Sequence, residues 1–160
     1  TALVDKRVLL LGAGGAAQAI SYGLHEERAE VTISNRTKSK AEELASKYSF
    51  KLIDLSDIEK LPAFDIIINA TSVGFMGSKS ETSLIGRKAI EHASLVFDIV
   101  FTPRATPLIK MAEELGVSTI CGTRMLVHQA IGQFRLWGYE NRIDVDKIEE
   151  NLVAFLSKEN

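Results

Sequence analysis

The stretch "VLLLGAGGAAQAI", which runs from Val8 to Ile20, decides how this chain folds. A short apolar run leads directly into three glycines set among alanines, and the residues after them favour a helix. This order is typical of a buried strand that turns sharply into a helix. We therefore predict a strand over Arg7–Leu11 and a helix over Gly15–His25, joined by a tight glycine turn.

The glycine turn fits the pattern G-x-G-x-x-A at Gly12, Gly14 and Ala17. In dinucleotide-binding proteins the first glycine allows the turn and the second lets the backbone approach a pyrophosphate. The small third residue lets helix and strand pack closely, and the phosphates sit at the helix N-terminus. The alternative is a tight turn without a ligand. The predicted cofactor-binding residues of this turn are Gly12, Ala13, Gly14, Gly15 and Ala16.

Strand-length apolar runs alternate with helical patterns along the rest of the chain. Because the strands are apolar on consecutive residues, we expect a parallel sheet that helices cover on both faces. The predicted fold is α/β, a Rossmann-like doubly wound parallel six-stranded sheet. One domain spans residues 1–160, with a C-terminal helical extension over about 139–160 and a Gly/Ser-rich loop over Gly74–Thr82. The further strands are predicted at Glu30–Ser34, Lys51–Ile53, Asp65–Ala70, Leu95–Val100 and Ser118–Cys121, and the further helices at Lys38–Tyr48, Ser56–Lys60 (one turn), Pro107–Leu115, about Arg124–Trp137 and about Val145–Leu156.

The end of the second predicted strand, "ISNRTKSK", indicates which dinucleotide the site prefers. An NAD site normally carries an acidic residue there to hold the ribose 2′-OH, whereas an arginine accommodates the 2′-phosphate of NADP. This chain has Asn35 followed by Arg36, so the sequence favours NADP. A helix cap at Thr37 or Ser39 with a solvated charge run is the alternative. The cofactor-binding residues predicted here are Asn35, Arg36, Thr37 and Lys40.

Composition narrows the classes of partner. The 160 residues are 46% hydrophobic and 25% charged, which suits a globular domain with its own core. A net charge of −2 gives no bulk attraction to nucleic acid, and no apolar run approaches the ~20 residues of a membrane span. Cys121 is the only cysteine, and the three histidines lack metal-ligand spacing. We therefore expect a cytoplasmic domain without metal, nucleic-acid or membrane binding, and the start at Thr1 suggests a piece of a longer protein.

Five segments of the chain together resemble the successive signatures of the shikimate dehydrogenase family. They are "GAGGAAQA", "NRTKSKAEELA", "DIIINATSVG", "DIVFTPRATPL" and "GTRMLVHQAIGQFRLWG", in the family's order and spacing. The resemblance implies a two-domain enzyme that reversibly reduces 3-dehydroshikimate to shikimate with NADPH in aromatic amino-acid biosynthesis. Only the cofactor domain is matched here. Because the family's catalytic Lys and Asp lie in the other domain, we assign no catalytic residue and expect cofactor binding without turnover.

Two alternatives to this function stay open on the sequence. The chain could be a stand-alone module that binds or senses NADP, or the cofactor domain of a quinate/shikimate dehydrogenase or another NADP reductase. In any of these enzymes the small-molecule substrate, shikimate or 3-dehydroshikimate for the first, would bind only with the domain that is not matched here.

The resemblance also implies contacts for the nicotinamide half of the cofactor. The residues concerned are Asn69, Ala70, Thr71, Ser72, Val100, Gly122 and Met125. The alternatives are a polar strand end that closes a turn at Asn69–Ser72, and core packing for Met125. For the substrate, Gln129 matches a residue that contacts substrate hydroxyls, one helical turn after Met125. Phe101 stands where many family members have Tyr, so it lacks that hydroxyl and could be a plain core aromatic.

Four further residues are expected to be structural, and the last helix carries its own prediction. We expect Asp98 to fix backbone at a strand end, Cys121 to be buried, and Phe134 and Trp137 to join a core stripe with Ala130. An apolar stripe in the last helix predicts a homodimer through that helix or a poorly ordered helix, because the family's last helix packs on the unmatched domain. Packing on its own core is the alternative. The stripe consists of Val145, Ile148, Leu152, Phe155 and Leu156.

Overall fold

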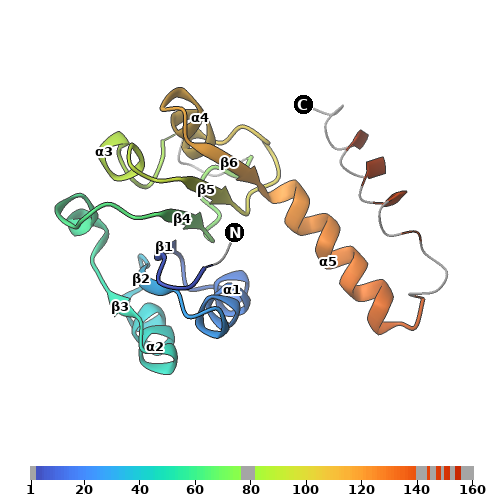
Figure 1. Cartoon of the computed structure of the whole chain (residues 1–160), viewed down its shortest axis with the longest axis horizontal. Helices are drawn as coiled ribbons and strands as arrows, with labels where there is room; N and C mark the ends of the chain where they lie inside the picture. The colour runs from blue at the N-terminus through green and yellow to red at the C-terminus, as the bar shows by residue number, and fades with distance from the viewer. Residues whose placement is uncertain are drawn as a thin grey trace.

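The computed structural model describes residues 3–76 and 82–139, together with 144, 147, 148, 150, 151, 154 and 155. Its centre is a sheet of six strands in the order β3-β2-β1-β4-β5-β6, and every pairing is parallel (Figure 1). This order reverses direction between β1 and β4, as in doubly wound folds. The predicted fold class is therefore confirmed. The strands are β1 (Arg7–Leu11), β2 (Glu30–Ser34), β3 (Lys51–Leu52), β4 (Ile66–Asn69), β5 (Leu95–Asp98) and β6 (Ser118–Cys121).

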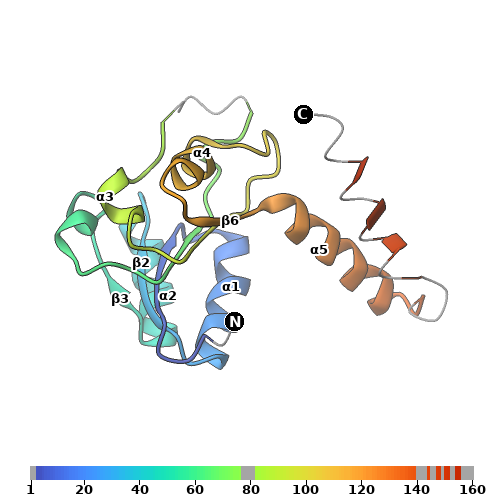
Figure 2. The same cartoon turned by 45° about the horizontal axis from the view of Figure 1, so that its top comes forward.

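Helices cover both faces of the sheet, which explains why its strands are apolar on consecutive residues. On β1, Val8 and Leu10 pack with α1 and α2, whereas Leu9 and Leu11 pack with η1, α3 and α4 (Figure 2). Successive side chains of a strand point to opposite faces, so both sets become core. The helices are α1 (Gly15–Glu26), α2 (Lys38–Tyr48), the 3₁₀ helix η1 (Leu55–Lys60), α3 (Arg87–Ile90), α4 (Pro107–Glu114) and α5 (Gly122–Leu136).

The sequence patterns predicted every one of these elements except α3. This helix has only four residues, so it is too short to show a helical period, although Ala89 and Ile90 are buried in the core. Other boundaries moved by one or two residues; α5 begins directly after β6 at Gly122. Of the predicted Gly74–Thr82 loop, residues 77–81 lie outside the described part of the chain.

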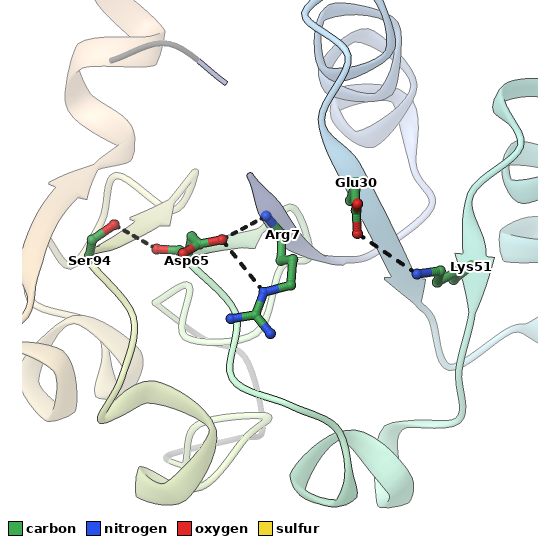
Figure 3. Close-up of polar contacts among 5 residues, drawn as sticks. All are labelled: Arg7, Glu30, Lys51, Asp65 and Ser94. Carbon is green, nitrogen blue, oxygen red and sulfur yellow. Dashed lines mark hydrogen bonds and ion pairs between the residues drawn. The ribbon is translucent and has the colours of Figure 1, made fainter. Parts of the chain in front are cut away.

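The amino ends of the strands are joined by polar contacts (Figure 3). The backbone N–H of Arg7 donates to Asp65 Oδ2 at 2.8 Å, and the guanidinium Nε of Arg7 lies 3.7 Å from the same oxygen. Ser94 Oγ donates to the backbone oxygen of Asp65 at 2.8 Å, and Lys51 Nζ lies 3.9 Å from Glu30 Oε2. The first set of contacts links the start of β1 to the starts of β4 and β5, and the second links the start of β2 to the start of β3.

Helix α5 extends away from the sheet beyond β6 (Figures 1 and 2). Two expectations for this region were wrong. Phe134 and Trp137 pack edge to face at 5.8 Å, but the Trp137 side chain is 64% exposed, so they do not form a core stripe. Cys121 is only partly buried, because β6 is the edge strand.

The predicted stripe of the last helix is only partly described. Val145, Leu152 and Leu156 lie outside the described residues, and Phe155 is 58% exposed. Among the residues that the structure describes, no helix is long and apolar enough to cross a membrane.

Candidate functional site

The turns that follow β1, β2 and β4 meet at the carboxyl edge of the sheet and enclose a cleft of about 540 Å³. Ligands of open α/β sheets bind at this edge, where the strand order reverses, and the volume suits a small molecule. The cleft is lined by Leu11, Gly12, Ala13, Gly14, Ser34, Asn35, Arg36, Thr37, Lys40, Leu55, Ala70, Thr71, Ser72, Val73 and Leu84.

The two glycines of the first turn have different roles. Gly12 has a φ of +112°, and a Cβ there would lie 2.7 Å from the backbone oxygen of Ala70. Its N–H donates to the backbone oxygen of Ser34 at 2.8 Å, so Gly12 joins the three turns. Gly14 has a φ of −89°, and a Cβ there would meet nothing within 4 Å. The space beside Gly14 is thus left open, as close approach of a pyrophosphate requires.

The N-terminus of α1 opens beside this space. Its N-cap is Gly14, which provides no side chain for the N–H groups of the first turn, and no acidic residue lies in that turn. Unpaired N–H groups and the helix dipole favour an anion here. Gly15 and Ala16 belong to this first turn but do not line the cleft. Their backbone N–H groups lie in the first turn of the helix, where N–H groups have no partner within the helix.

The turn after β2 adds positive charge to the cleft. Arg36 and Lys40 are both exposed and line it, and neither has an ion-pair partner within the described ranges 3–76 and 82–139. Asn35 Nδ2 donates to the backbone oxygen of Thr37 at 2.8 Å and holds the turn. Thr37 is the N-cap of α2, but its hydroxyl makes no capping hydrogen bond. The Thr37 side-chain cap that the sequence allowed is therefore absent, and Thr37 lines the cleft.

The turn after β4 forms the opposite wall and is held by Asn69. This side chain is 2% exposed, and its Oδ1 accepts from the N–H of Thr71 at 3.1 Å and from Thr71 Oγ1 at 2.7 Å. Its Nδ2 donates to the backbone oxygen of Val73 at 3.2 Å. Asn69 does not line the cleft, whereas Ala70, Thr71 and Ser72 do. The polar strand end thus closes a turn, and that turn presents its outer side to the cleft.

Asp98 lies behind this wall at the end of β5, with no exposed surface. Its Oδ1 accepts from Asn69 Nδ2 at 2.9 Å and from the N–H of Val100 at 3.0 Å, and its Oδ2 accepts from Thr106 Oγ1 at 2.7 Å. Burial raises the pKa of this carboxyl above its ordinary value of 3.8, although the three hydrogen bonds oppose the rise. The expectation that Asp98 fixes backbone at a strand end is confirmed.

The other residues predicted from the resemblance lie outside this cleft. Gly122 begins α5, where a Cβ would overlap the backbone oxygen of Ile99, so close packing requires a glycine there. Phe101 is partly exposed and packs edge-on against Phe75 at 6.0 Å. The remaining three, Val100, Met125 and Gln129, do not line the cleft either.

Sequence reasoning missed some residues of the cleft. Leu55 comes from η1 and Leu84 from the loop before α3, and neither carries a motif that could have singled it out. Ser34 is 2% exposed, and its hydroxyl has no hydrogen-bond partner among the described residues. Those residues also contain no group of His, Cys, Asp and Glu that could hold a metal ion.

Comparison with known proteins shows the family to which this chain belongs. The family model described as shikimate / quinate 5-dehydrogenase matches residues 1–120. The chain belongs to this family. A relative named shikimate dehydrogenase (NADP(+)), from Methanocella arvoryzae, is 42% identical over 151 residues, which are 89% of this chain and 55% of the relative.

Solved structures of shikimate/quinate dehydrogenases have the same fold. One is the Thermus thermophilus shikimate 5-dehydrogenase in complex with NADP(H) and shikimate, with a TM-score of 0.77 and 28% identity over 94% of this chain and 55% of that one. Another is a quinate dehydrogenase from Corynebacterium glutamicum in complex with NAD, with a TM-score of 0.80 and 28% identity over 96% of this chain and 56% of that one. This chain spans about half the length of each of the three proteins.

Proposed function

We propose that this chain is the NADP(H)-binding domain of a shikimate dehydrogenase. The observation that carries the proposal is the exposed Arg36, which lines the cleft beside the glycine turn and has no ion-pair partner in the described part of the chain. Among the described residues, no acidic residue lines the cleft. A guanidinium there can bind a 2′-phosphate through charge-assisted hydrogen bonds, whereas an NAD site would carry a carboxylate. The NADP(+)-dependent relative from Methanocella arvoryzae supports the same choice.

Each turn of the cleft would then hold a different part of the cofactor. The first turn of α1 binds the pyrophosphate through its N–H groups beside Gly14, and Arg36 and Lys40 bind the 2′-phosphate, with Thr37 as a hydroxyl donor. The turn after β4 supports the nicotinamide half of the cofactor, which extends towards β5. Bound NADPH supplies the hydride that reduces the carbonyl of 3-dehydroshikimate. This chain holds and orients the cofactor, and the substrate site needs residues that this chain does not carry.

Arg36→Ala tests the preference for NADP. We expect wild type to bind NADP+ more tightly than NAD+, and the substitution to weaken NADP+ binding by roughly 1.5–3 kcal/mol, because a charge-assisted contact to the 2′-phosphate is lost. The affinity for NAD+ should change little. Isothermal titration of both cofactors against both proteins gives the four dissociation constants.

Arg135→Ala is the matched control for this experiment. Arg135 is an exposed arginine at the far end of α5 and does not line the cleft. Its replacement by Ala changes the net charge of the chain by the same amount as Arg36→Ala. It should leave both affinities unchanged. Equal affinity of wild type for NAD+ and NADP+ would contradict the proposal.

The second expectation is that the chain alone does not oxidise shikimate above background. Among the described residues, none that lines the cleft is a His, Asp, Glu, Cys or Tyr, and the catalytic Lys and Asp that the family resemblance implies belong to the domain that this chain does not match. Without such a group, roughly a 10²–10⁴-fold contribution of proton transfer is missing. The assay is NADP+ reduction at saturating shikimate, and turnover at rates typical of enzymes would overturn this point.

A quinate dehydrogenase is the second candidate, favoured by the Corynebacterium glutamicum structure. That structure contains NAD, so the same titration of NADP+ against NAD+ distinguishes the two candidates at the level of the cofactor. A strong preference for NADP+ would favour the shikimate enzyme.

A further inference from the structure

Packing of the core alone does not explain why an acidic residue, Asp98, stands at this buried position. A carboxylate without exposed surface is costly unless hydrogen bonds compensate it, and a neutral side chain could fill the same space. Asp98 does not line the cleft, so it cannot contact a ligand there. Its hydrogen-bond partners, however, connect it to the cleft wall on one side and to α4 on the other.

The connection to the cleft wall passes through the amide of Asn69. An ionised carboxylate only accepts hydrogen bonds, so Asp98 requires the NH₂ end of that amide to face it. The amide oxygen must then point to the opposite side, where it accepts from the N–H and the hydroxyl of Thr71. Asp98 thus fixes the orientation of an amide whose other end holds the turn.

The turn held in this way lies against the glycine turn. Thr71 Oγ1 also accepts from the N–H of Val73 at 3.1 Å, so the Asn69 amide and the Thr71 hydroxyl together fix the turn. On its other side, the backbone oxygen of Ala70 and the methyl group of Thr71 approach the Cα of Gly12 so closely that no Cβ would fit there. A shift of this turn would therefore change the distance between the two walls of the cleft.

We propose that Asp98 is a positioning residue for the cofactor cleft, which holds the turn Ala70–Val73 in place through the side chain of Asn69. This inference rests on the proposed function, because it takes NADP(H) as the ligand of the cleft. The affinity for the cofactor should then depend on the hydrogen bond between Asp98 and Asn69, and not on the contacts that Asp98 makes with α4.

The structure provides a control for this distinction. Thr106 donates to the other carboxylate oxygen of Asp98 and caps α4 by accepting from the N–H of Ile109 at 3.2 Å. Thr106→Val removes both contacts with little change of shape and leaves the bond between Asp98 and Asn69 in place. Thr106→Val should lower stability without changing the affinity for NADP+. If Asp98 had a purely structural role, Thr106→Val and Asp98→Ala would change that affinity in the same way.

The test measures the dissociation constant for NADP+ of four variants, each under conditions where thermal melts show it to be folded. Asp98→Ala and Asn69→Ser both break the connection, and we expect each to weaken NADP+ binding roughly five- to tenfold, the equivalent of about one hydrogen bond. Asp98→Asn keeps an oxygen that can accept from Asn69, so it should bind within about twofold of wild type. Thr106→Val should do the same.

The outcomes are distinct. Unchanged affinity in both Asp98→Ala and Asn69→Ser would overturn the inference, and so would an equal loss in Thr106→Val. Where Asp98→Ala does not fold, Asn69→Ser against Thr106→Val gives the same comparison. A wild-type chain that does not bind NADP+ would overturn the proposed function itself, and this inference with it.

Discussion

At the scale of single residues, the cleft depends on two glycines. Substitution of one should lower stability, whereas substitution of the other should weaken cofactor binding. Gly12→Ala places a Cβ 2.7 Å from the backbone oxygen of Ala70 at a φ of +112°. We expect it to lower the free energy of unfolding by roughly 1–3 kcal/mol, since both the backbone conformation and the contact are unfavourable. Gly14→Ala meets no atom within 4 Å, so it should change stability little. It should nevertheless weaken NADP+ binding at least about tenfold, because the methyl group occupies the space left for the pyrophosphate.

Urea denaturation and NADP+ titration of the two variants separate these effects. Gly132→Ala is a suitable control, because Gly132 lies within α5, where an added Cβ also meets nothing within 4 Å. It should bind NADP+ as wild type does. If Gly14→Ala binds NADP+ with wild-type affinity, the pyrophosphate does not lie where the glycine pattern and the helix N-terminus predict it.

At the scale of helices and strands, periodicity and turn chemistry predicted most of the fold from the sequence. The consecutive apolar residues of Val8–Leu11 indicated a strand buried on both faces, and both core clusters use them. Periodicity could not reveal α3, which has a single turn. Local motifs placed the glycine turn and the turn after β2 in the cleft, whereas Leu55 and Leu84 reach it only through the tertiary fold. Similarly, the apolar pattern of α5 predicted burial for Trp137, but α5 extends away from the sheet (Figure 1), and Trp137 is 64% exposed.

The junction between β4, β5 and α4 gives a prediction for the dependence of stability on pH. Burial raises the pKa of Asp98 in the folded chain above 3.8, the ordinary value expected for the unfolded chain. Between these two pKa values the folded state binds the proton more strongly, so the stability that Asp98 contributes falls as the pH rises. Asp98→Asn cannot titrate. The free energy of unfolding of wild type minus that of Asp98→Asn should therefore decrease as the pH rises from below the ordinary pKa of Asp98 to neutral pH.

Urea denaturation of both proteins across this pH range gives this difference in free energy directly. All other titratable groups are the same in the two proteins, so their contributions cancel in the difference. A difference that rises with pH would mean that the hydrogen bonds from Asn69, Val100 and Thr106 outweigh burial and lower the pKa. Binding of NADP+ should stay close to wild type in Asp98→Asn, which separates this effect from the positioning of the cleft.

At the scale of the whole molecule, several large apolar side chains are exposed on α5 and just after it, and α5 extends away from the sheet (Figure 1). Leu136 is 87% exposed and Trp137 64%, and Phe155 is exposed as well. Exposed apolar patches of this kind mark contact sites, and burying one such side chain contributes roughly 1.5–3 kcal/mol. We therefore predict that the chain forms a homodimer through the exposed side chains of α5. The prediction from the sequence, a homodimer or a poorly ordered helix, concerned the stripe of the next helix, of which Val145, Leu152 and Leu156 lie outside the described residues.

Sedimentation equilibrium over a range of concentrations tests this prediction. Replacing Leu136 and Trp137 by Ser should weaken dimerisation at least about tenfold, because each copy then loses two large apolar side chains from the interface. Tyr22→Ser on α1 is the control, since Tyr22 is a similarly exposed aromatic residue on the body of the domain and should leave the equilibrium unchanged. NADP+ binding should be the same in the monomer and the dimer, because the cleft is lined by the turns after β1, β2 and β4 and not by α5. A wild-type chain that stays monomeric at high concentration would show that the exposed face of α5 does not bind a second copy.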